Sequence, residues 1–432
     1  MIFFYRILFL PMWLLVMPYY AFRRIKRGGY LRRWWQRWGL YETRLPKKSS
    51  EKKRIWIHAV SVGELKSIGH LLHKLRQNPR IEVFLTISTS TAYRIVEEQY
   101  ASLLLAYAWF PWDFYPVMCL AWQHIQPDMV LLVDEELWPE FLTQASCHKV
   151  PVFLVNARLS DRSYRHYRRV PHWVRWLGKH ITWITLPSEE EATKFKNIGM
   201  PSHCLSVIGN LKWDREPILS SPEERLRLRE ELGFSPKDIV LIGMSTWPGE
   251  ESLLLNFLKK VRHKGVLPSV RLLLVPRHAE RRDEVSALLH RSGFSWYRRS
   301  EGKAKSEVDV VLADTTGELE RLAFAGNIAF IGKSFGKNRG GQNPLDAAFA
   351  GLPMIYGPHM SNFQTMAHAL EVENVAWVIH DENELCEQLL RLLGNASLRE
   401  GISSHLQGWV RQQMGATEKI YARIREQFSV EK

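Results

Sequence analysis

The stretch Ile55-Trp-Ile-His-Ala-Val-Ser-Val-Gly-Glu64 decides how this sequence is expected to fold. Its first part, Ile55–Val60, is mostly apolar and rich in β-branched residues, which predicts a buried strand. The pattern breaks at Ser61-Val62-Gly63, and from Leu65 onward apolar residues recur at helical spacing. Glu64 therefore stands where a parallel strand ends and a helix begins, which is the edge at which open α/β sheets bind ligands.

Two interpretations of Glu64 are open from this stretch alone. A carboxylate in a ligand-binding crevice is a candidate for chemistry. A carboxylate in the first turn of a helix is also stabilised by the positive end of the helix dipole, with no function beyond that.

Strand-like and helix-like segments alternate on both sides of a charged, proline-bounded connection at Glu216–Pro236. Alternating βα units predict parallel, doubly wound sheets, so we expect an α/β protein with two Rossmann-like domains facing across a cleft. The expected boundaries are 1–22 for a membrane anchor, 23–215 for a first domain and 216–432 for a second with a long terminal helix. The predicted strands are Ile55–Val60, Val83–Ser88, Leu103–Ala108, Met129–Val133, Val152–Val155, Trp183–Leu186, one near Val207, Ile239–Met244, Val270–Val275, Val308–Leu312, Asn327–Ile331, Met354–Tyr356 and Ala376–Ile379, and the predicted terminal helices are Asn383–Leu393 and Leu398–Phe428.

The segment Met1–Phe22 carries a single charge, Arg6. As a helix it would be about 33 Å long, enough to cross a hydrocarbon core. Pro11 and Pro18 would kink that helix, so an anchor lying in the membrane interface is the alternative to a single span. A helix buried in the soluble domain is a third interpretation. A basic run follows, interleaved with tryptophans, and favours a cytoplasmic location for the rest of the chain; its members are Arg23, Arg24, Lys26, Arg27, Arg32, Arg33, Arg37, Trp34, Trp35 and Trp38.

Composition narrows the class of protein. The 432 residues, 46% hydrophobic and 24% charged, describe a folded chain too long for one core. The four cysteines have no C-x-x-C spacing, which argues against a zinc site or a disulfide framework. The net charge of +14 indicates an anionic partner. We do not expect nucleic acid, because the basic run is fused to an apolar segment.

Several candidate binding segments follow strands in the second half. Ser245–Glu250 offers hydroxyls and amides that could cap a helix or hold a phosphate. Pro276-Arg277-His278 and Thr315–Glu318 also follow strands, and Gly340–Asp346 combines a glycine pair, a proline at a helix start and an acid. Each is explained by ordinary capping when taken alone, but together they predict a nucleotide site.

Two further candidates lie in the first half. Asp134-Glu135-Glu136 places three carboxylates at the end of a central strand, and such acids repel one another unless cations are near. Acids solvated on a loop are the alternative. Lys212 lies near the end of the first domain and could neutralise a substrate anion, or could be a surface charge.

In order along nearly the whole chain, these stretches resemble the 3-deoxy-D-manno-octulosonic acid (Kdo) transferase family of lipopolysaccharide synthesis, whose fold is GT-B. The resemblance is carried by the basic N-terminal region, His58–Glu64, Glu136–Pro139, Asn156–Ser160 with Arg162-Ser163, Gly209–Lys212, Pro276–His278, Gly317-Glu318, Asn343–Leu345 and Gly357–His359 with Asn362-Phe363.

The resemblance implies an inverting transferase that moves Kdo from CMP-Kdo to the lipid A precursor (lipid IVA) at the cytoplasmic face of the bacterial inner membrane. It implies that Glu64 is the catalytic base and that Asp134 and Lys212 stabilise the transition state. It implies a CMP-Kdo site made by Pro276, Arg277, Gly317, Glu318, Leu319, Asn343, Pro344, Leu345 and Asp346. No D-x-D motif is evident, so we expect neither a bound metal nor a cofactor.

Five residues in three stretches depart from the family's usual pattern. Asp134-Glu135-Glu136 replaces Glu-Thr-Glu, Trp247 replaces a histidine before Pro-Gly-Glu, and Gln342 and Asp346 replace histidine and glutamate. These changes keep two alternatives open: a GT-B transferase of another activated sugar, such as a heptosyl- or hexosaminyl-transferase, and a membrane scaffold without activity. Retention of Glu64 and Lys212 argues against the scaffold.

Overall fold

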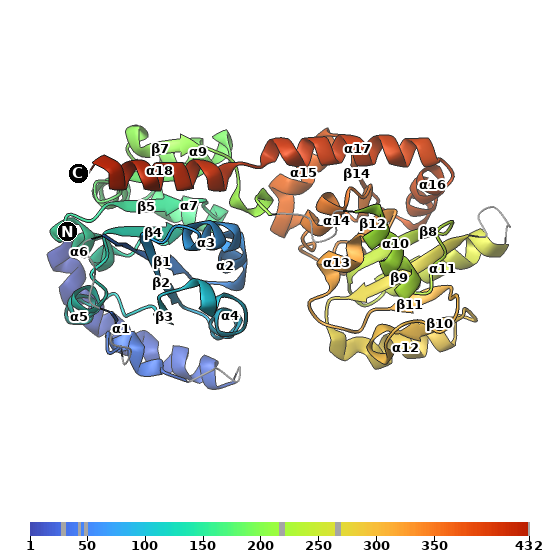
Figure 1. The fold of residues 1–432 in the computed structure, drawn as a ribbon, viewed down its shortest axis with the longest axis horizontal. Helices are drawn as coiled ribbons and strands as arrows, with labels where there is room; N and C mark the ends of the chain where they lie inside the picture. Colours follow the sequence, from blue (N-terminus) through green and yellow to red (C-terminus); the bar gives the residue numbers. More distant parts are fainter. Residues whose placement is uncertain (27–31, 42–44, 47–50, 216–220, 264–268, 431–432) are drawn as a thin grey trace. The chain divides into compact units, whose positions relative to one another are not determined.

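The computed structural model describes residues 1–26, 32–41, 45–46, 51–215, 221–263 and 269–430, with the side chains of 19–26 and 430 excepted. Arg27 of the basic run and the start of the predicted connection at 216–220 lie outside the described residues. The chain forms two compact units (Figure 1): unit 1 is Met1–Arg215 with Gln413–Lys432, and unit 2 is Glu216–Gln412.

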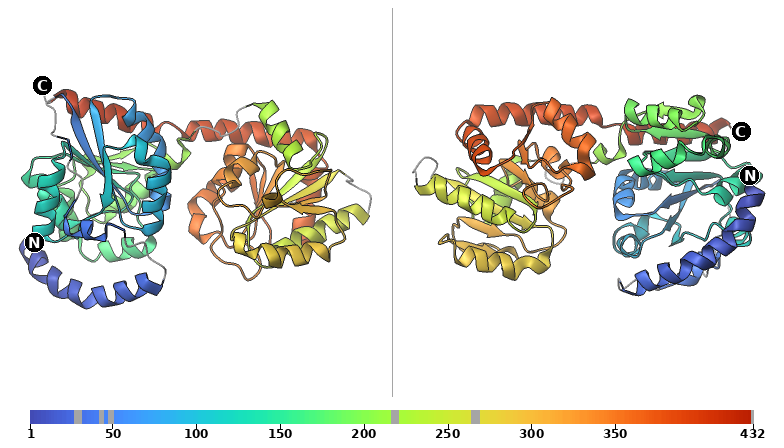
Figure 2. Two further views of the ribbon diagram at one scale, coloured as in Figure 1. Left: turned by 60° about the horizontal axis from the view of Figure 1, so that its bottom comes forward. Right: turned by 180° about the vertical axis from the view of Figure 1, so that it is seen from behind.

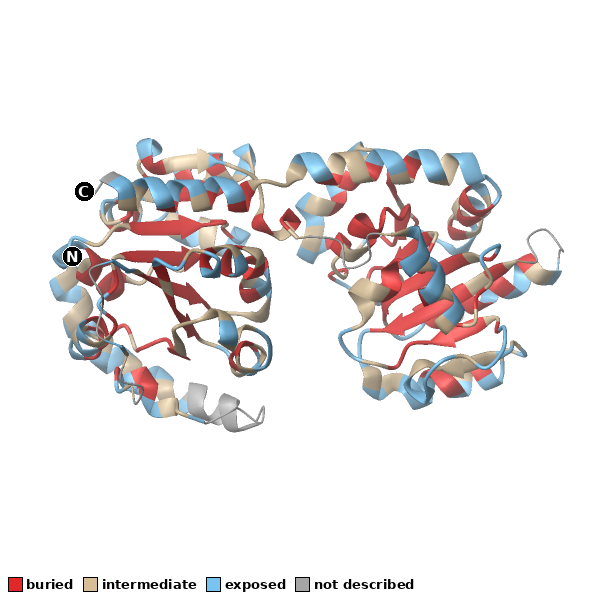
Figure 3. Ribbon diagram, in the orientation of Figure 1, coloured by how far each residue is buried: buried red, intermediate tan, exposed pale blue. Residues whose placement is uncertain are grey.

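Unit 1 is built on a seven-stranded sheet in the order β3-β2-β1-β4-β5-β6-β7, with every pairing parallel. Apolar residues fill both faces of the central strands, which are red in Figure 3. Parallel pairing brings the carboxyl ends of the central strands to one edge of the sheet. The strands are β1 Lys53–Ala59, β2 Ile81–Ile87, β3 Ala106–Trp109, β4 Met129–Val133, β5 Val152–Val155, β6 Trp183–Leu186 and β7 Leu205–Val207.

Helices cover the two faces of this sheet (Figure 1). They are α1 Ile2–Lys26, α2 Val62–Ser67, α3 Gly69–Arg76, α4 Ser90–Ile95, α5 Tyr115–Ile125, α6 Pro139–Cys147, α7 Asp161–Tyr167, α8 Pro171–Gly178, α9 Glu189–Asn197 and α18 Ala416–Val430.

Unit 2 has a second seven-stranded parallel sheet, in the order β10-β11-β9-β8-β12-β13-β14. The α/β class and two Rossmann-like units are therefore confirmed. The strands are β8 Ile239–Thr246, β9 Val270–Pro276, β10 Trp296–Arg298, β11 Val310–Leu312, β12 Ile328–Ile331, β13 Met354–Tyr356 and β14 Ala376–Val378, and the helices are α10 Pro222–Glu231, α11 Glu250–His263, α12 Arg282–His290, α13 Leu319–Ala323, α14 Leu345–Ala350, α15 Gln364–Val372, α16 Glu382–Leu393 and α17 Ala396–Gln413.

Two segments differ from their predicted roles. The predicted connection holds helix α10, because Ser221 and Glu224 form a capping box and Leu228 is buried. The predicted terminal helix Leu398–Phe428 is two helices that break at Gly415, where φ is +108°. Asp214 accepts hydrogen bonds from the Gly415 and Thr417 amides, so α18 packs into unit 1 rather than ending the second domain.

The N-terminal helix α1 lies along the outside of unit 1 in both views of Figure 2. Tyr5 donates to Asp113 at 2.7 Å, and Arg6 forms a two-pronged ion pair with the buried Glu140 at 2.8 and 2.9 Å. Phe9 stacks on Phe114. In the described part of the chain no helix has the length and apolarity needed to cross a membrane. The packing contacts of α1 show that one side of it lies against unit 1, and the membrane anchor, whether spanning or interfacial, stays a prediction.

Candidate functional site

Glu64 lies in the first turn of α2, directly after β1. One carboxylate oxygen accepts from the Val60 amide at 2.6 Å, and the other accepts from the Ser61 hydroxyl at 2.8 Å. Ser61 in turn caps the helix by accepting from the Glu64 amide at 3.3 Å. Glu64 and Ser61 therefore do make the contacts of a helix cap, as the second interpretation of Glu64 expects.

The capping contacts do not account for the raised pKa of the Glu64 carboxyl. Burial raises the pKa of its carboxyl to about 7, even though hydrogen bonds from Val60 and Ser61 act in the opposite direction, and the nearby Asp134 raises the pKa further. A carboxyl with a pKa near neutrality is poised to accept a proton and release it again. This is the behaviour required of a general base.

Asp134 follows β4, which is the neighbour of β1 in the sheet. Its backbone is in the left-handed region at φ +62°, and its carboxylate accepts a hydrogen bond from the Asn156 side-chain amide at 2.8 Å. The Asn156 side-chain oxygen accepts from the Leu211 amide at 3.3 Å. The buried Asn156 therefore ties Asp134 to the turn that carries Lys212, a role that the sequence did not assign to it.

Lys212 sits in a 3₁₀ turn, Leu211–Trp213, at the same edge of the sheet. Burial lowers the pKa of its ammonium, and the neighbouring Arg158 charge lowers it too, whereas Asp134 and Glu64 act in the opposite direction. The structure thus gathers the three predicted catalytic residues into one electrostatically coupled group.

Arg158 is the functional candidate that sequence reasoning missed. Its Nε and Nη2 atoms are buried and have no hydrogen-bond partner among the described residues. Buried guanidinium donors without partners are costly, and Arg158 also lies close enough to Lys212 to lower the pKa of that lysine, so Arg158 is a candidate for contact with a bound anion. Its place in the quoted stretch Asn156–Ser160 was the only signal in the sequence.

The other two acids of the strand-end cluster are not solvated loop residues. Glu135 accepts from the Ser163 hydroxyl at 3.1 Å, and burial raises the pKa of Glu135. Glu136 accepts from the Trp138 indole at 2.5 Å and lies 3.7 Å from the buried His58. These two acids shape the loop on which Asp134 stands.

In unit 2, the predicted donor residues lie at the carboxyl edge of the second sheet. Pro276 is the buried last residue of β9, and the exposed Arg277 follows it, its amide donating to Thr246 at 3.1 Å. Gly317 has φ +88°, and Glu318 precedes α13 and lies 3.5 Å from Arg299. Leu319 begins α13 and is half-buried.

The loop that leads into α14 depends on its glycine pair. Gly340 and Gly341 both have positive φ, and a Cβ on them would lie 2.5 Å from Asn362 and 2.4 Å from Met360. The Asn343 side chain accepts from the Leu345 amide at 3.2 Å, in the turn that leads into α14. The buried Pro344 and Leu345 and the half-buried Asp346 form the start of that helix.

Glu250, the first residue of α11, binds several backbone amides with its carboxylate. Its buried carboxylate accepts from the amides of Trp247 (2.8 Å), Lys333 (2.9 Å), Ser334 (3.0 Å) and Phe335 (3.2 Å). Within Ser245–Glu250, the Trp247 amide is therefore bonded to a side chain of its own segment, as the capping alternative expects, and the phosphate alternative stays a prediction for the other amides and hydroxyls. Glu250 also joins the end of β8 to the loop after β12.

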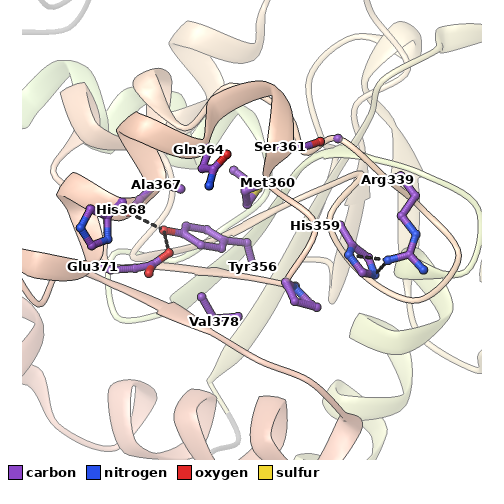
Figure 4. A pocket seen from close by; sticks show the side chains of 13 residues that line it. Arg339, Tyr356, His359, Met360, Ser361, Gln364, Ala367, His368, Glu371 and Val378 are labelled. Atoms are coloured by element: carbon purple, nitrogen blue, oxygen red, sulfur yellow. Dashed lines mark hydrogen bonds between the residues drawn. The ribbon is translucent and has the colours of Figure 1, made fainter. Parts of the chain in front are cut away.

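A cavity of about 470 Å³ opens beside Gly340 (Figure 4). Arg339 bonds to His359 at one end of it, and at the other end the Tyr356 hydroxyl donates to Glu371 at 3.1 Å. None of the residues assigned to the CMP-Kdo site lines it, but Gly340 of the candidate segment Gly340–Asp346 does, together with Gly357–His359 of the resemblance. Within the described residues, no group of three or more His, Cys, Asp or Glu side chains is arranged to hold a metal ion.

Comparison with known proteins agrees with the motifs. Residues 32–215 match the family model described as 3-Deoxy-D-manno-octulosonic-acid transferase (kdotransferase). The chain is similar to a 3-deoxy-D-manno-octulosonic acid transferase of Bordetella pertussis, 30% identical over 84% of this chain and 85% of that protein. A transferase of the same name from Haemophilus influenzae is 29% identical over 97% of this chain and 96% of that one.

Among solved structures, a UDP-GlcNAc 2-epimerase from Neisseria meningitidis bound to UDP-GlcNAc superposes with a TM-score of 0.59 and 14% identity. It covers 86% of this chain and 100% of that chain, and the likeness concerns the GT-B-like fold alone. The sequence relatives carry the family assignment, because identity of 30% extends over most of both chains. This chain belongs to the 3-deoxy-D-manno-octulosonic acid transferase family.

Proposed function

We propose that this protein is an inverting glycosyltransferase that moves Kdo from CMP-Kdo to the lipid A precursor in lipopolysaccharide synthesis. The observation that carries the proposal is the group of Glu64, Asp134 and Lys212 at the carboxyl edge of the sheet, in which a carboxyl with a pKa of about 7 lies within electrostatic range of a lysine. Unit 1 would bind the acceptor, and unit 2 would bind the CMP-sugar.

In the proposed mechanism, Glu64 takes the proton of an acceptor hydroxyl as that oxygen attacks the anomeric carbon. The bond between the anomeric carbon and the phosphate oxygen breaks, and CMP leaves with the bonding electrons. Asp134 and Lys212 would stabilise the charge that develops at the sugar, and Arg277 would face the departing phosphate. The proton on Glu64 then passes to solvent, which restores the base.

This mechanism predicts a pH dependence. The value of kcat/KM should rise as the pH increases through about 7, because only ionised Glu64 accepts a proton. The contribution of Glu64 to the free energy of unfolding changes with pH in the opposite direction. Folding raises the pKa of the Glu64 carboxyl above its ordinary 4.5, so its stabilising contribution is complete below pH 4.5 and is lost as the pH rises through about 7. Initial rates measured across this range are the check, and a flat profile would contradict the assignment.

The outward side of α1 supports attachment to the membrane interface. Large apolar side chains are exposed along it, among them Phe4 at 69% and Leu15 at 80%. The basic residues that follow in the sequence suit an anionic lipid surface. We propose that α1 lies in the interface, at the cytoplasmic face of the inner membrane, and does not cross it.

The full-length protein should therefore sediment with anionic lipid vesicles and stay bound at high salt, because buried apolar area is not screened. The double variant Phe4→Asp/Leu15→Asp should be released into the supernatant. Leu226→Asp, which changes an exposed leucine of unit 2, is the matched control and should still sediment. Release of the unaltered protein by salt would mean that charge alone holds it.

The proposed function is tested by incubating the purified protein with CMP-Kdo and a tetra-acylated lipid A precursor, then weighing the lipid by mass spectrometry. We expect the mass to increase by whole Kdo units. CMP, but not UDP or ADP, should protect the protein against heating. Protection by UDP or ADP instead, without a Kdo product, would favour a transferase of another activated sugar.

A further inference from the structure

Lys333 lies at the switch point of the unit 2 sheet. The chain places β9 on one side of β8 and later returns to place β12 on the other side. Ligands bind in the crevice at such a point, outside the carboxyl ends of the strands. Lys333 is the second residue after β12, so its position is at this crevice.

The backbone of Lys333 is held rigidly in an uncommon conformation. Its φ is +58°, in the left-handed region that lysine seldom adopts. Its amide donates to the buried Glu250 at 2.9 Å, and its carbonyl accepts from the Gly341 amide at 2.9 Å. A Cβ on the preceding Gly332 would lie 2.3 Å from the Ser245 carbonyl oxygen. Lys333 is thus fixed between the end of β8 and the loop that leads to Asn343.

The side chain of Lys333 is held as well. Its ammonium lies 4.6 Å from the centroid of the Trp247 ring, and Trp247 meets the His278 ring edge-on at 5.4 Å. The three side chains come from the ends of β12, β8 and β9. No carboxylate in the described part of the chain forms an ion pair with Lys333. The result is a positioned cation whose charge is not neutralised by those residues.

Three backbone amides close to Lys333 already donate hydrogen bonds within the protein. The Trp247, Ser334 and Phe335 amides all donate to Glu250, so they do not face a ligand. A nucleotide phosphate at this edge therefore needs its positive partners from side chains. In the proposed mechanism Arg277 faces the departing phosphate, whereas Lys333 has no role in it.

We propose that Lys333, positioned by Trp247, binds the phosphate of the donor nucleotide and stabilises it as it leaves. The inference rests on the proposed function, because it assumes that unit 2 binds a CMP-sugar. It adds a phosphate-binding residue to that site. It also gives a physical role to Trp247, which stands where the family usually has histidine. Trp247 is a positioning residue here, since it acts through the lysine.

The test compares the affinities of the full-length protein for CMP and for cytidine, which lacks the phosphate. Lys333→Asn keeps a residue that tolerates positive φ, so the fold should be preserved. We expect it to weaken CMP binding by at least about tenfold, the loss typical of a charge-assisted contact, and to leave cytidine binding unchanged. Lys333→Arg should retain most of the CMP affinity. Lys337→Asn removes an exposed lysine four residues away and is the control for overall charge.

Each outcome separates the two proposals. If the unaltered protein fails to bind CMP, the proposed function fails. If it binds CMP but Lys333→Asn binds equally well, the phosphate role of Lys333 is wrong. An equal loss for CMP and cytidine would mean that the variant changes the pocket and not a phosphate contact, which also overturns the inference. Trp247→Leu should weaken CMP binding in the unaltered background and have no further effect beside Lys333→Asn, whereas weaker cytidine binding would contradict its positioning role.

Discussion

Glu64→Gln should fold normally, bind CMP with unchanged affinity and lose transfer by at least about two orders of magnitude. Glutamine keeps the size of the side chain, and its carbonyl oxygen can still accept a hydrogen bond from Val60 or Ser61. It cannot accept the proton of the attacking hydroxyl. Single-turnover transfer, measured alongside CMP affinity, separates the loss of chemistry from a loss of binding.

Ser61→Ala is the matched control, because it removes the helix cap and leaves the carboxyl in place. It should cost roughly 0.5–2 kcal/mol of stability. Because the Ser61 hydroxyl bond lowers the pKa of Glu64, the pH profile of transfer should move to higher pH, with turnover retained once Glu64 is ionised. If Glu64 were only a capping residue, the two variants would behave alike. Near-normal transfer by a well-folded Glu64→Gln protein would end both the general-base mechanism and the assignment of the acceptor site to unit 1.

Arg6→Leu should destabilise unit 1 by about 3 kcal/mol, because it leaves a buried carboxylate without its cation. Glu140 has no exposed side-chain area, and besides Arg6 it is bonded to the Gln144 amide at 2.8 Å. Denaturant unfolding followed by tryptophan fluorescence is the measurement. This loss of stability is at the low end of the range for breaking a buried ion pair, because a third of the Arg6 side chain is exposed to solvent.

The double variant Arg6→Leu/Glu140→Gln distinguishes the pair from simple loss of packing. Removing both charges should recover most of the stability, since no buried charge remains unpaired. If Arg6→Leu alone unfolded at the same denaturant concentration as the unaltered protein, α1 would not be held by this pair.

The central strands were predictable because burial on both faces leaves an unmistakable pattern. Met129–Val133, Val152–Val155 and Trp183–Leu186 were predicted with the bounds that the structure has. By contrast, β10 at Trp296–Arg298 is short, lies at a sheet edge and is only half-buried. Such a strand depends on its neighbour β11 for its structure, so its own residues carry little signal.

Within the site, the groups that could be named from the sequence were those at strand ends. Glu64 and Asp134 follow adjacent strands, so their proximity follows from the topology. The contact of Asn156 with Leu211 joins residues 55 positions apart, and no local pattern encodes it. The same holds for Lys333 and Trp247, whose pairing depends on the return of β12 to the side of β8. Long-range partners of charged groups were therefore the part that sequence reasoning could not supply.

The return of α18 to unit 1 has a consequence for synthesis of the chain. Ala416, Ile420 and Ile424 belong to the same apolar core as β1 and α3, and Lys74 pairs with Glu418 across 344 residues of sequence. At ribosomal rates of about 5–20 residues per second, that interval lasts roughly 17–70 s. Unit 2 lies wholly inside it. The unit that begins the chain is therefore the last to be completed, and the apolar residues of β1 and α3 that α18 covers stay uncovered on the nascent chain until the final helix is made.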